Sequence, residues 1–358
     1  MAARPIRPPG PLAFPSLTLV NIAGPAFSKA SILIIVLWVL CLLSTFAVIS
    51  GYGARQKLSL VGRLEERDKL RYIAEAGAKK ALAELKNEPL KSYDAFRDRW
   101  SNNPAAFANI AVADGWATVS YEYFDGAAKA ARIQYGLIDE ERKININKAE
   151  PEILERLFRI VLAIDEQAAK ELAAAIVDWR DSDGKSADTA SNAEDSYYMN
   201  LEYSYEAKDA DFEVLEEVLL VKGMDSSLFQ KLKDYLTIYG DGKVNINTAS
   251  ATVLLALGLS DELADKILSY RSGEDRELGT ADDNVFDSGF NIVPLLSQAF
   301  HFSDSQVAQL SSVAAKSLGV CSSNFVIRSA GRLPPRKAAS EVTCVADRQG
   351  KILYWQAR

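Results

Sequence analysis

One short motif occurs twice in the chain, and it constrains the fold more than any other feature. Residues 144–149 read Ile-Asn-Ile-Asn-Lys-Ala, and residues 244–249 read Val-Asn-Ile-Asn-Thr-Ala. Each copy precedes two short segments in which apolar residues have helical spacing, separated by a brief polar break. The sequence therefore predicts a duplicated helix-hairpin-helix unit over residues 144–180 and 244–271.

The polar residues of each copy predict helix starts. Asn147 and Thr248 can accept hydrogen bonds from the exposed N–H groups of a first helical turn, with Glu150 or Ser250 close behind. Two short antiparallel helices bury little surface alone. We therefore expect the two copies to pack on each other or on a neighbouring layer.

Length and composition exclude several classes of protein. A chain of 358 residues predicts two or three folded units, and a net charge of −7 disfavours a surface for phosphate backbones. No Gly-rich phosphate loop or nucleophile elbow occurs, and the lone His301 is expected to be a packing or surface residue, so we do not expect an enzyme. Cys321 and Cys344 both fall among predicted C-terminal strands and could form a disulfide in an extracytoplasmic compartment.

The N-terminal region predicts a membrane helix. Residues 31–54 carry no charge and are long enough to span the hydrocarbon core of a bilayer. The helical pattern continues from Arg55 to Leu85 without a breaker before Pro89, which favours one helix of roughly 55 residues over a cleaved secretory signal. Basic residues flank both ends of the span, so charge leaves its orientation open.

This N-terminal arrangement resembles that of the type IV pilins and pseudopilins, in which a basic leader precedes an apolar helix that leads into a soluble domain. The resemblance implies that a prepilin peptidase cuts between Ala30 and Ser31, that the new terminus is methylated, and that the mature helix packs into a filament core. Ala30 replaces the glycine usual before the cut, and Ile35 replaces the glutamate usual at the fifth mature position.

Three further segments are similar to the large minor pseudopilins of type II secretion systems, the protein K (GspK) family, which commonly lack that glutamate. Residues 136–147 resemble the entry to the inserted helical domain of this family, residues 176–183 with 192–198 resemble its acidic signature, and residues 244–249 resemble its second repeat. The resemblance implies a subunit at the tip of the secretion pseudopilus. A subunit with nothing ahead of it has no neighbouring terminal amine to neutralise, which fits Ile35 in place of the glutamate.

The same resemblance implies the partners and the location. The partners would be the other minor pseudopilins, the prepilin peptidase and secreted protein substrates, with no nucleic acid. The chain would be a single-pass protein of the inner membrane, with its soluble domain in the periplasm. A related type IV pilus with a similar tip subunit, and a membrane-anchored scaffold that never enters a filament, remain alternatives.

Strand signals bracket the helical region, as this resemblance requires. Residues 116–124 and 132–138 are rich in β-branched and aromatic side chains and predict a hairpin around Asp125-Gly126. Three more strands are predicted near the C-terminus, at residues 324–330, 341–345 and 351–355.

The predicted fold class is α+β. A long N-terminal helix lies on a pilin-like antiparallel sheet, and an all-helical domain with duplicated helix-hairpin-helix (SAM-like) repeats interrupts that sheet. The predicted boundaries are the leader at 1–30, the transmembrane helix at 31–54, its amphipathic continuation at 55–88, the pilin-like strands at 89–143, the inserted helical domain at 144–318 and the C-terminal strands at 319–358.

Two acidic loops are candidate metal sites. The first contains Asp178, Asp181, Asp183, Glu194 and Asp195, and the second contains Asp275, Asp282, Asp283 and Asn284. Hard cations such as Ca²⁺ collect about six to eight oxygen ligands from such loops. The resemblance adds that this family's helical domain is associated with calcium, which implies a structural Ca²⁺ that holds a loop in place. The alternative for each loop is a solvated polar segment without a metal.

The alternative function is DNA binding. The same motif opens the helix-hairpin-helix of competence-type DNA receptors, which are also membrane-anchored and bind phosphate through a Gly-x-Gly hairpin backed by Lys or Arg. The hairpins of this chain are residues 163–166 and 258–261. The first lacks glycine, and both carry an acidic residue where a phosphate would lie.

Overall fold

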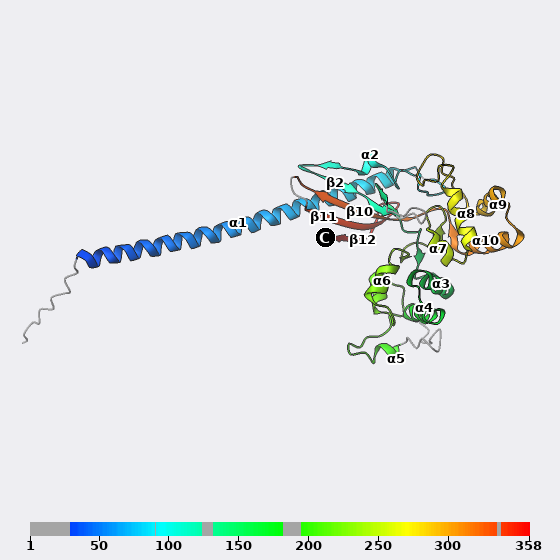
Figure 1. Cartoon of the computed structure of the whole chain (residues 1–358), viewed down its shortest axis with the longest axis horizontal. Coiled ribbons are helices and arrows are strands. Elements are labelled where there is room, and N and C mark those ends of the chain that lie inside the picture. The colour runs from blue at the N-terminus through cyan, green and yellow to red at the C-terminus, as the bar shows by residue number, and fades with distance from the viewer. Residues whose placement is uncertain (1–28, 90, 124–131, 182–194, 335–337) are drawn as a thin grey trace, which may run out of the picture. The chain divides into compact units, whose positions relative to one another are not determined.

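The computed structural model describes residues 29–89, 91–123, 132–181, 195–334 and 338–358 (Figure 1). The chain divides into two compact units, Met1–Glu65 and Glu66–Arg358. Helix α1 (Lys29–Asn87) begins in the first unit and ends in the second, just before Pro89, because proline lacks the N–H that a continuing helix needs. The predicted continuous helix is confirmed. Most of the predicted leader lies outside the described residues.

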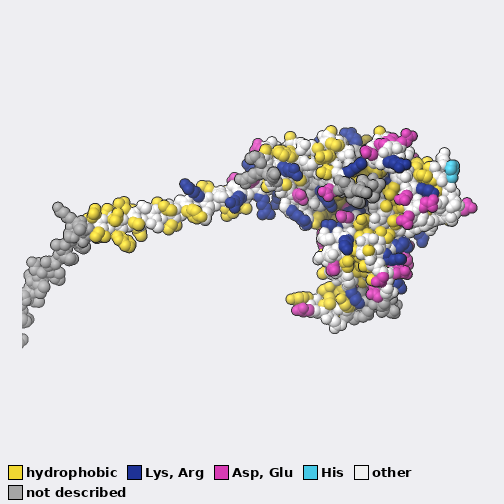
Figure 2. Space-filling model, viewed as in Figure 1, with side chains coloured by type: hydrophobic (Ala, Val, Ile, Leu, Met, Phe, Trp, Pro, Cys, Tyr) yellow, Lys and Arg dark blue, Asp and Glu magenta, His cyan; other side chains and the backbone are white. Residues whose placement is uncertain are grey.

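The first unit contributes an exposed apolar helix. All the apolar side chains of α1 from Ile32 to Leu64 that the structure describes are exposed, and Figure 2 shows apolar atoms crowded along this part of the helix. The hydroxyl of Thr45 donates to the carbonyl oxygen of Cys41, 2.8 Å away, so the helix itself satisfies this polar group. By length and composition, this helix is able to cross a membrane.

In the second unit, the C-terminal part of α1 packs on an antiparallel sheet. Its buried residues recur every three or four positions: Leu70, Ile73, Ala74, Ala78, Ala81, Leu82 and Leu85. Helix and sheet approach each other closely at two glycines, because a Cβ atom on Gly331 would collide with the backbone of Leu70 and one on Gly77 would collide with Ser329. Small residues at the contact therefore set the distance between helix and sheet.

The sheet has the strand order β1-β2-β10-β11-β12, and β5 lies beside β10 on the same side as β2. Its strands are β1 (Ile110–Val112), β2 (Gly115–Val119), β5 (Ile138–Asp139), β10 (Asn324–Arg332), β11 (Ala339–Asp347) and β12 (Ile352–Ala357). A short helix, α2 (Pro104–Phe107), buries Phe107 against the same core. The three predicted C-terminal strands are confirmed.

The predicted hairpin is confirmed only in part. β3 (Tyr121–Tyr123) pairs with β4 (Arg132–Gln134) in antiparallel fashion, and the turn expected between them lies outside the described residues. The strand predicted at 116–124 is divided in two, because β2 pairs with β10 instead of β4. The backbone N–H of Ser120, at the division, donates to the Arg328 carbonyl oxygen at 3.2 Å.

The helical insertion enters after β5 and leaves before β10, and these two strands are antiparallel neighbours. Its helices are α3 (Pro151–Leu162), α4 (Glu166–Arg180), α5 (Asp195–Tyr198), η1 (Leu215–Leu220), α6 (Ser226–Leu232), α7 (Ala251–Ala256), α8 (Asp261–Arg271), η2 (Gly289–Asn291), α9 (Ile292–Phe300) and α10 (Asp304–Ser317). One continuous apolar core runs through both copies of the repeat, and α3 packs on α7. The two copies therefore pack on each other, as expected.

The insertion is not wholly helical, because each Asn motif begins with a short strand. β6 (Ile144–Asn145) pairs in parallel with β7 (Leu236–Thr237), and β8 (Val244–Asn245) pairs in parallel with β9 (Leu318–Gly319). Each copy of the repeat is thus closed by a strand from further along the chain. The sequence prediction of an all-helical domain missed these pairs because two-residue strands have no readable periodicity.

The side-chain hydrogen bonds of the motif are duplicated as well. Arg180 at the end of α4 donates to the carbonyl oxygens of Ile146 and Ala149, and Arg271 at the end of α8 donates to those of Ile246 and Ala249. The amide groups of Asn147 and Asn247 likewise bind the backbones of Phe212 and Phe286, at 2.8–3.0 Å. The repeated sequence therefore encodes a repeated local structure.

The helix starts differ from the prediction. Asn147 and Thr248 lie before the helices, whereas the N-cap residues are Glu150 and Ser250, followed by α3 and α7. Asn147 uses its amide to hold a distant loop, and Thr248 donates its hydroxyl to Asp139, so neither side chain caps a helix. Pro151 at the first position of α3 needs no N–H partner, which fixes the start of that helix.

Candidate functional site

A network of buried carboxylates joins the insertion to the pilin-like sheet. Asp139 at the end of β5 is 1% exposed, and Asp94 and Glu141 are each 5% exposed. We call Asp94, Asp139 and Glu141, with the residues that they bind, the junction. Glu141 accepts hydrogen bonds from the backbone N–H groups of Ser323 and Asn324, at 3.0 and 3.1 Å. The entering and leaving chains of the insertion are therefore tied directly to each other.

Asn245, from the second copy of the motif, lies at the centre of the junction. Its fully buried Nδ2 donates to the Asp94 carbonyl oxygen, to Asp139 Oδ2 and to Ser322 Oγ, at 3.0, 3.1 and 2.8 Å. The hydroxyl of Thr248 donates to the same oxygen of Asp139 at 2.5 Å. The second motif thereby connects the insertion, the entering strand and the segment after α1.

Burial dominates the electrostatics of the junction. It raises the pKa of Asp94 to about 6, although the Arg348 guanidinium, which forms an ion pair with it, acts in the opposite direction. Burial and the neighbouring Asp139 raise the pKa of Glu141 to about 8, and burial raises the pKa of Asp139 as well. The carboxylates of the junction thus keep their protons to a higher pH than the same groups would in water.

Sequence reasoning did not identify the junction. One signal was present, because residues 139–141 read Asp-Glu-Glu between a predicted strand and the first Asn motif. Asp94 and Arg348 lie 254 positions apart and carry no local pattern. Only the tertiary structure brings them together.

The first acidic loop lies mostly beyond what the structure describes. Asp183 and Glu194 are outside the described residues, and the side chain of Asp195 is not described either. Asp178 is fully buried on α4, and Asp181 is the C-cap residue of that helix. Trp179 is buried and packs on the rings of Tyr198 and Tyr205.

The second acidic loop is held together by its own hydrogen bonds. Asp282 Oδ2 accepts from the N–H groups of Glu274 and Asp275, and Asp283 Oδ2 accepts from that of Gly279 at 2.7 Å. The hydroxyl of Thr280 and those backbone N–H groups lower the pKa of Asp282 to about 2. Asn284 turns its amide to the Tyr270 carbonyl oxygen.

The two loops supply no assembled metal site in the described structure. Among the residues that the structure describes, no three His, Cys, Asp or Glu side chains converge as a metal site. Asp275, Asp282 and Asp283 are near one another in the second loop, but their carboxylates each bind different N–H groups. Calcium therefore stays a prediction from the sequence.

The predicted disulfide is wrong, because Cys321 and Cys344 are free thiols in the structure. Cys344 lies opposite Ile327 in the pairing of β11 with β10, and Cys321 precedes Ile327 by six residues. Along an extended chain this is roughly 20 Å, whereas a disulfide needs Cα atoms within about 7 Å. Burial raises the pKa of the Cys344 thiol to about 12.

The remaining predicted positions fall on α1 and on the hairpins. Ala30 and Ser31 lie in the first turns of α1, and Ile35 is 52% exposed. His301 is an exposed residue at the end of α9, as expected. In the first hairpin, the Asp165 carboxylate accepts from the N–H of Ala168 at 2.9 Å, so an acid already occupies the N-terminus where a phosphate would bind.

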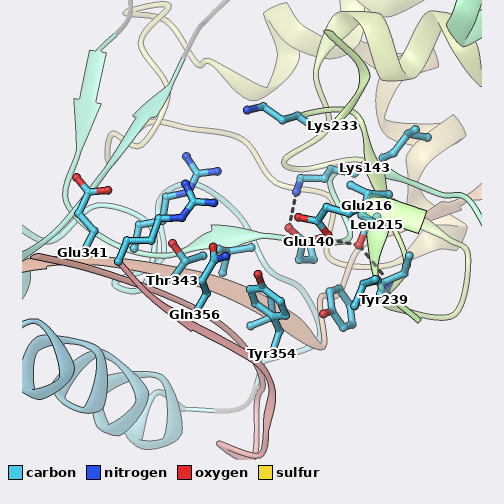
Figure 3. Close-up of a pocket in the computed structure, with 18 residues that line it drawn as sticks. Glu140, Lys143, Leu215, Glu216, Lys233, Tyr239, Glu341, Thr343, Tyr354 and Gln356 are labelled. Atoms are coloured by element: carbon cyan, nitrogen blue, oxygen red, sulfur yellow. Dashed lines mark hydrogen bonds and ion pairs between the residues drawn. The ribbon is translucent and has the colours of Figure 1, made fainter. Parts of the chain in front are cut away.

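A cavity of about 390 Å³ lies between the outer face of the sheet and the first half of the insertion (Figure 3). β10, β11 and β12 form one wall, with Thr343, Tyr354 and Gln356 among the lining residues, and the region around η1 and β7 forms the other. The lining is mixed in charge. Its basic members are Lys143, Lys233, Arg328 and Arg358, and its acidic members are Glu140, Glu216 and Glu341.

Comparison with known proteins identifies the architecture. Residues 134–241, which contain the first Asn motif and its helices, match a family model described as type II secretion system (T2SS), protein K. The whole fold is similar to a chain of the crystal structure of the GspK-GspI-GspJ complex from the type 2 secretion system of enterotoxigenic Escherichia coli. The TM-score is 0.59 and the identity 20%, over 83% of this chain and 99% of that one. A search of curated proteins gives no significant match.

The match of residues 134–241 and the similar structure make this chain similar to the protein K (GspK) minor pseudopilins of type II secretion. The resemblance to the protein K family predicted from the sequence is confirmed for residues 134–241, and the predicted α+β fold with a long N-terminal helix and a helical insertion is confirmed by the similar structure.

Proposed function

We propose that this chain caps the tip of a type II secretion pseudopilus and acts there without catalysis. The observation that carries the proposal is the placement of the insertion between two neighbouring strands, β5 and β10, with its two ends fastened by the buried junction. On this proposal, the helical domain held in this way blocks the stacking of a further subunit above it.

The N-terminal part of the proposal concerns processing and location. We propose that the prepilin peptidase cuts between Ala30 and Ser31, that the new terminus is methylated, and that α1 then anchors the chain in the inner membrane with the rest in the periplasm. The exposed apolar surface of α1 supports the membrane anchor. Intact mass and N-terminal sequencing of protein from host membranes test the cut, and a chain that retains residues 1–30 would contradict it.

Ile35 supports the tip position. A pilin subunit inside a filament uses a glutamate at this point to pair with the terminal amine of its neighbour, whereas a subunit with nothing ahead of it has no such amine. A carboxylate at position 35 would then be buried without a partner, which is costly in an apolar filament core. We therefore expect Ile35→Glu to reduce assembly, with Ile35→Leu as the matched control.

The experiment that tests the tip proposal combines this variant with removal of the insertion. Because β5 and β10 are adjacent, residues 144–318 can be replaced by a short Gly-Ser linker without separating the strands. We expect loss of exoprotein secretion, with longer or unregulated pseudopili on overexpression. Normal secretion and assembly in both the Ile35→Glu and the deletion strains would overturn the proposal.

The partners proposed for this chain are the other minor pseudopilins and the secreted substrates. The solved complex contains GspI and GspJ beside GspK, which supports subunits of those types as neighbours. We propose that the apolar surface of α1 makes these contacts. Co-purification from detergent of the three subunits tests the assembly, with Leu58→Asp on the exposed surface of α1 as the disrupting variant.

A structural Ca²⁺ is a further proposal, and it rests on the spacing of acids in the sequence. The residues that would hold it are those of the two acidic loops, and the ion would order a loop that lacks an apolar core. Calorimetric titration with CaCl₂ after chelation tests it, with Asp283→Asn and Asp181→Asn reporting on the two loops. Absence of binding in the wild-type chain would contradict it.

A further inference from the structure

β12 is the edge strand of the sheet, and part of its backbone is unpaired. Among the described strands it pairs only with β11. Glu341 and Arg358 exchange both backbone hydrogen bonds, at 2.9 and 3.2 Å. Paired and unpaired residues alternate in an antiparallel ladder, so Gln356 turns its backbone groups toward β11, whereas Trp355 and Ala357 turn theirs outward. No described residue binds these outward groups.

The sequence of β12 offers little protection for such an edge. It reads Ile-Leu-Tyr-Trp-Gln-Ala, without a charge or a proline, and Ile352 and Leu353 are 45% and 39% exposed. Edge strands that must stay unpaired generally carry a lysine, a proline or an inward-pointing charge. Here the nearest charges, Lys351 and Arg358, lie just outside the strand. The edge is therefore suited to accept another strand.

The cavity of Figure 3 lies on the face to which alternate residues of β12 point. Tyr354, Gln356 and Arg358 line it, while Trp355 packs on the opposite face with the α1 core. A strand added to β12 would direct every second side chain toward this cavity. Backbone pairing combined with pockets for alternate side chains is how sheet edges recognise extended peptides.

Charge indicates what kind of side chain the cavity takes. Lys143 pairs with Glu140, but Lys233, Arg328 and Arg358 form no ion pair with a described side chain. Glu216 and Glu341 also line the cavity, so the unpaired cations exceed the unpaired acids by one. A second copy of β12 would bring only another Arg358 to this place, which disfavours self-pairing.

We propose that the free edge of β12, with the cavity beside it, is a docking site for an extended segment of another polypeptide. The segment adds to β12 as a strand and places an acidic side chain among Lys233, Arg328 and Arg358. This inference does not depend on the tip position, since it concerns the sheet and the first half of the insertion alone.

The test uses the full chain in detergent micelles and short peptides displayed on phage. Selection should enrich peptides that alternate apolar residues with one Asp or Glu, and a synthetic copy of the most enriched peptide then serves as the probe. We expect the amides of Trp355 and Ala357 to exchange hydrogen more slowly when this peptide is bound. Replacing its acid by Lys should weaken binding by about tenfold or more, equivalent to about 1.4 kcal/mol.

Three variants separate the backbone and the charge contributions. Ala357→Pro removes an outward N–H but leaves the ladder with β11 intact, and it should lower the affinity for the probe at least tenfold. Arg328→Glu should do the same, whereas Arg332→Glu, on the same face of β10 but outside this cavity, should not. If Ala357→Pro fails to fold, the Arg328→Glu variant still tests the charge contribution, and the amide-exchange measurement on the wild-type chain still tests strand addition to β12.

Several results would overturn the proposal. They are the absence of any enriched acidic peptide, unchanged amide exchange at Trp355 and Ala357, equal binding by Arg328→Glu, and cross-linking of β12 to β12 of a second copy.

Discussion

The two copies of the Asn motif have the same local structure but different positions in the fold. In both, the terminal arginine binds two carbonyl oxygens of the motif, and the second Asn binds a distant phenylalanine backbone. The first Asn differs. Asn145 donates to Tyr239 and Gly240 within the insertion, whereas Asn245 donates to residues on three separate segments at the junction. Both copies of the motif therefore have the same local hydrogen bonds, but only the second copy also bonds to the segments at which the insertion joins the sheet.

The neighbouring position shows the same divergence. Lys148 of the first copy is exposed and forms a surface ion pair with Asp211, at 2.9 Å. Thr248 of the second copy is fully buried and donates to Asp139. A lysine could not occupy the second position, because its ammonium would be buried where Thr248 needs only a short hydroxyl. The difference between Lys148 and Thr248 thus marks which copy faces water, whereas Ile144 and Val244 are buried in both copies.

Substitution of the first Asn of each motif is expected to give the largest difference in stability between the two copies. Asn245→Ala leaves several buried groups without a partner and should lower the free energy of unfolding by about 3 kcal/mol. Asn145→Ala removes two bonds to carbonyl oxygens and should cost about 1 kcal/mol. Urea unfolding of the full chain in detergent measures both. Equal losses of unfolding free energy in the two variants would mean that the junction contacts of Asn245 add no stability beyond the local hydrogen bonds of the motif.

The terminal arginines provide the next test. Arg271 is 2% exposed and Arg180 is half-buried, although each binds the same two carbonyl oxygens of its motif. Replacement by Met keeps much of the volume and removes the charge-assisted bonds, so Arg271→Met should cost about 2–3 kcal/mol and Arg180→Met about 1–2 kcal/mol. Thermal unfolding with and without each variant measures the difference. A larger loss at Arg180 would contradict the comparison.

The pH dependence separates the junction from the first copy. The raised pKa values of Asp94, about 6, and Glu141, about 8, mean that the folded chain holds protons that the unfolded chain releases above its usual carboxyl pKa. Their contribution is complete below about pH 4 and is lost as pH rises toward 8, so stability should fall by about 1–3 kcal/mol over that range.

Glu141→Gln is the variant that checks this slope, because it removes the titrating group while keeping the shape of the side chain. We expect the decrease in unfolding free energy between pH 5 and pH 8 to become smaller in this variant. Glu150→Gln, at the exposed cap of the first copy, is the matched control and should leave the slope unchanged. A wild-type chain that is more stable at pH 8 than at pH 5 would contradict the expectation.

The smallest effect is expected at the hairpins. Ala163 and Gly258 occupy equivalent positions and both have left-handed backbone, with φ of 56° and 98°. Gly258→Ala introduces strain and should cost about 1 kcal/mol. Ala163→Gly relieves strain but loosens the unfolded chain, so its net effect should be within about 0.5 kcal/mol. Denaturation midpoints of the pair measure this, and a larger loss from Ala163→Gly would show that the two hairpins are not equivalent.

The sequence predicted the features that depend on local spacing. Patterns of a few residues predicted the continuous helix α1, the strands β10 to β12 and the two helical pairs after the motifs. The structure contains all of these elements. The division of the strand at Ser120 and the two-residue strands β6 and β8 were missed, because pairing partners decide them. The Cys321–Cys344 disulfide was wrong for a similar reason, since strand register sets the distance between two cysteines and composition does not.

By itself, the sequence determined the long apolar helix, the duplicated motif and the resemblance to the protein K family, because hydrophobic periodicity and short motifs are local properties. Only the tertiary structure decided which copy of the motif would be buried at the junction, and that Asp94, Asp139 and Glu141 would share it. Burial of a charge depends on what packs around it. Residues far apart in the chain supply that surrounding, and no window of sequence contains them.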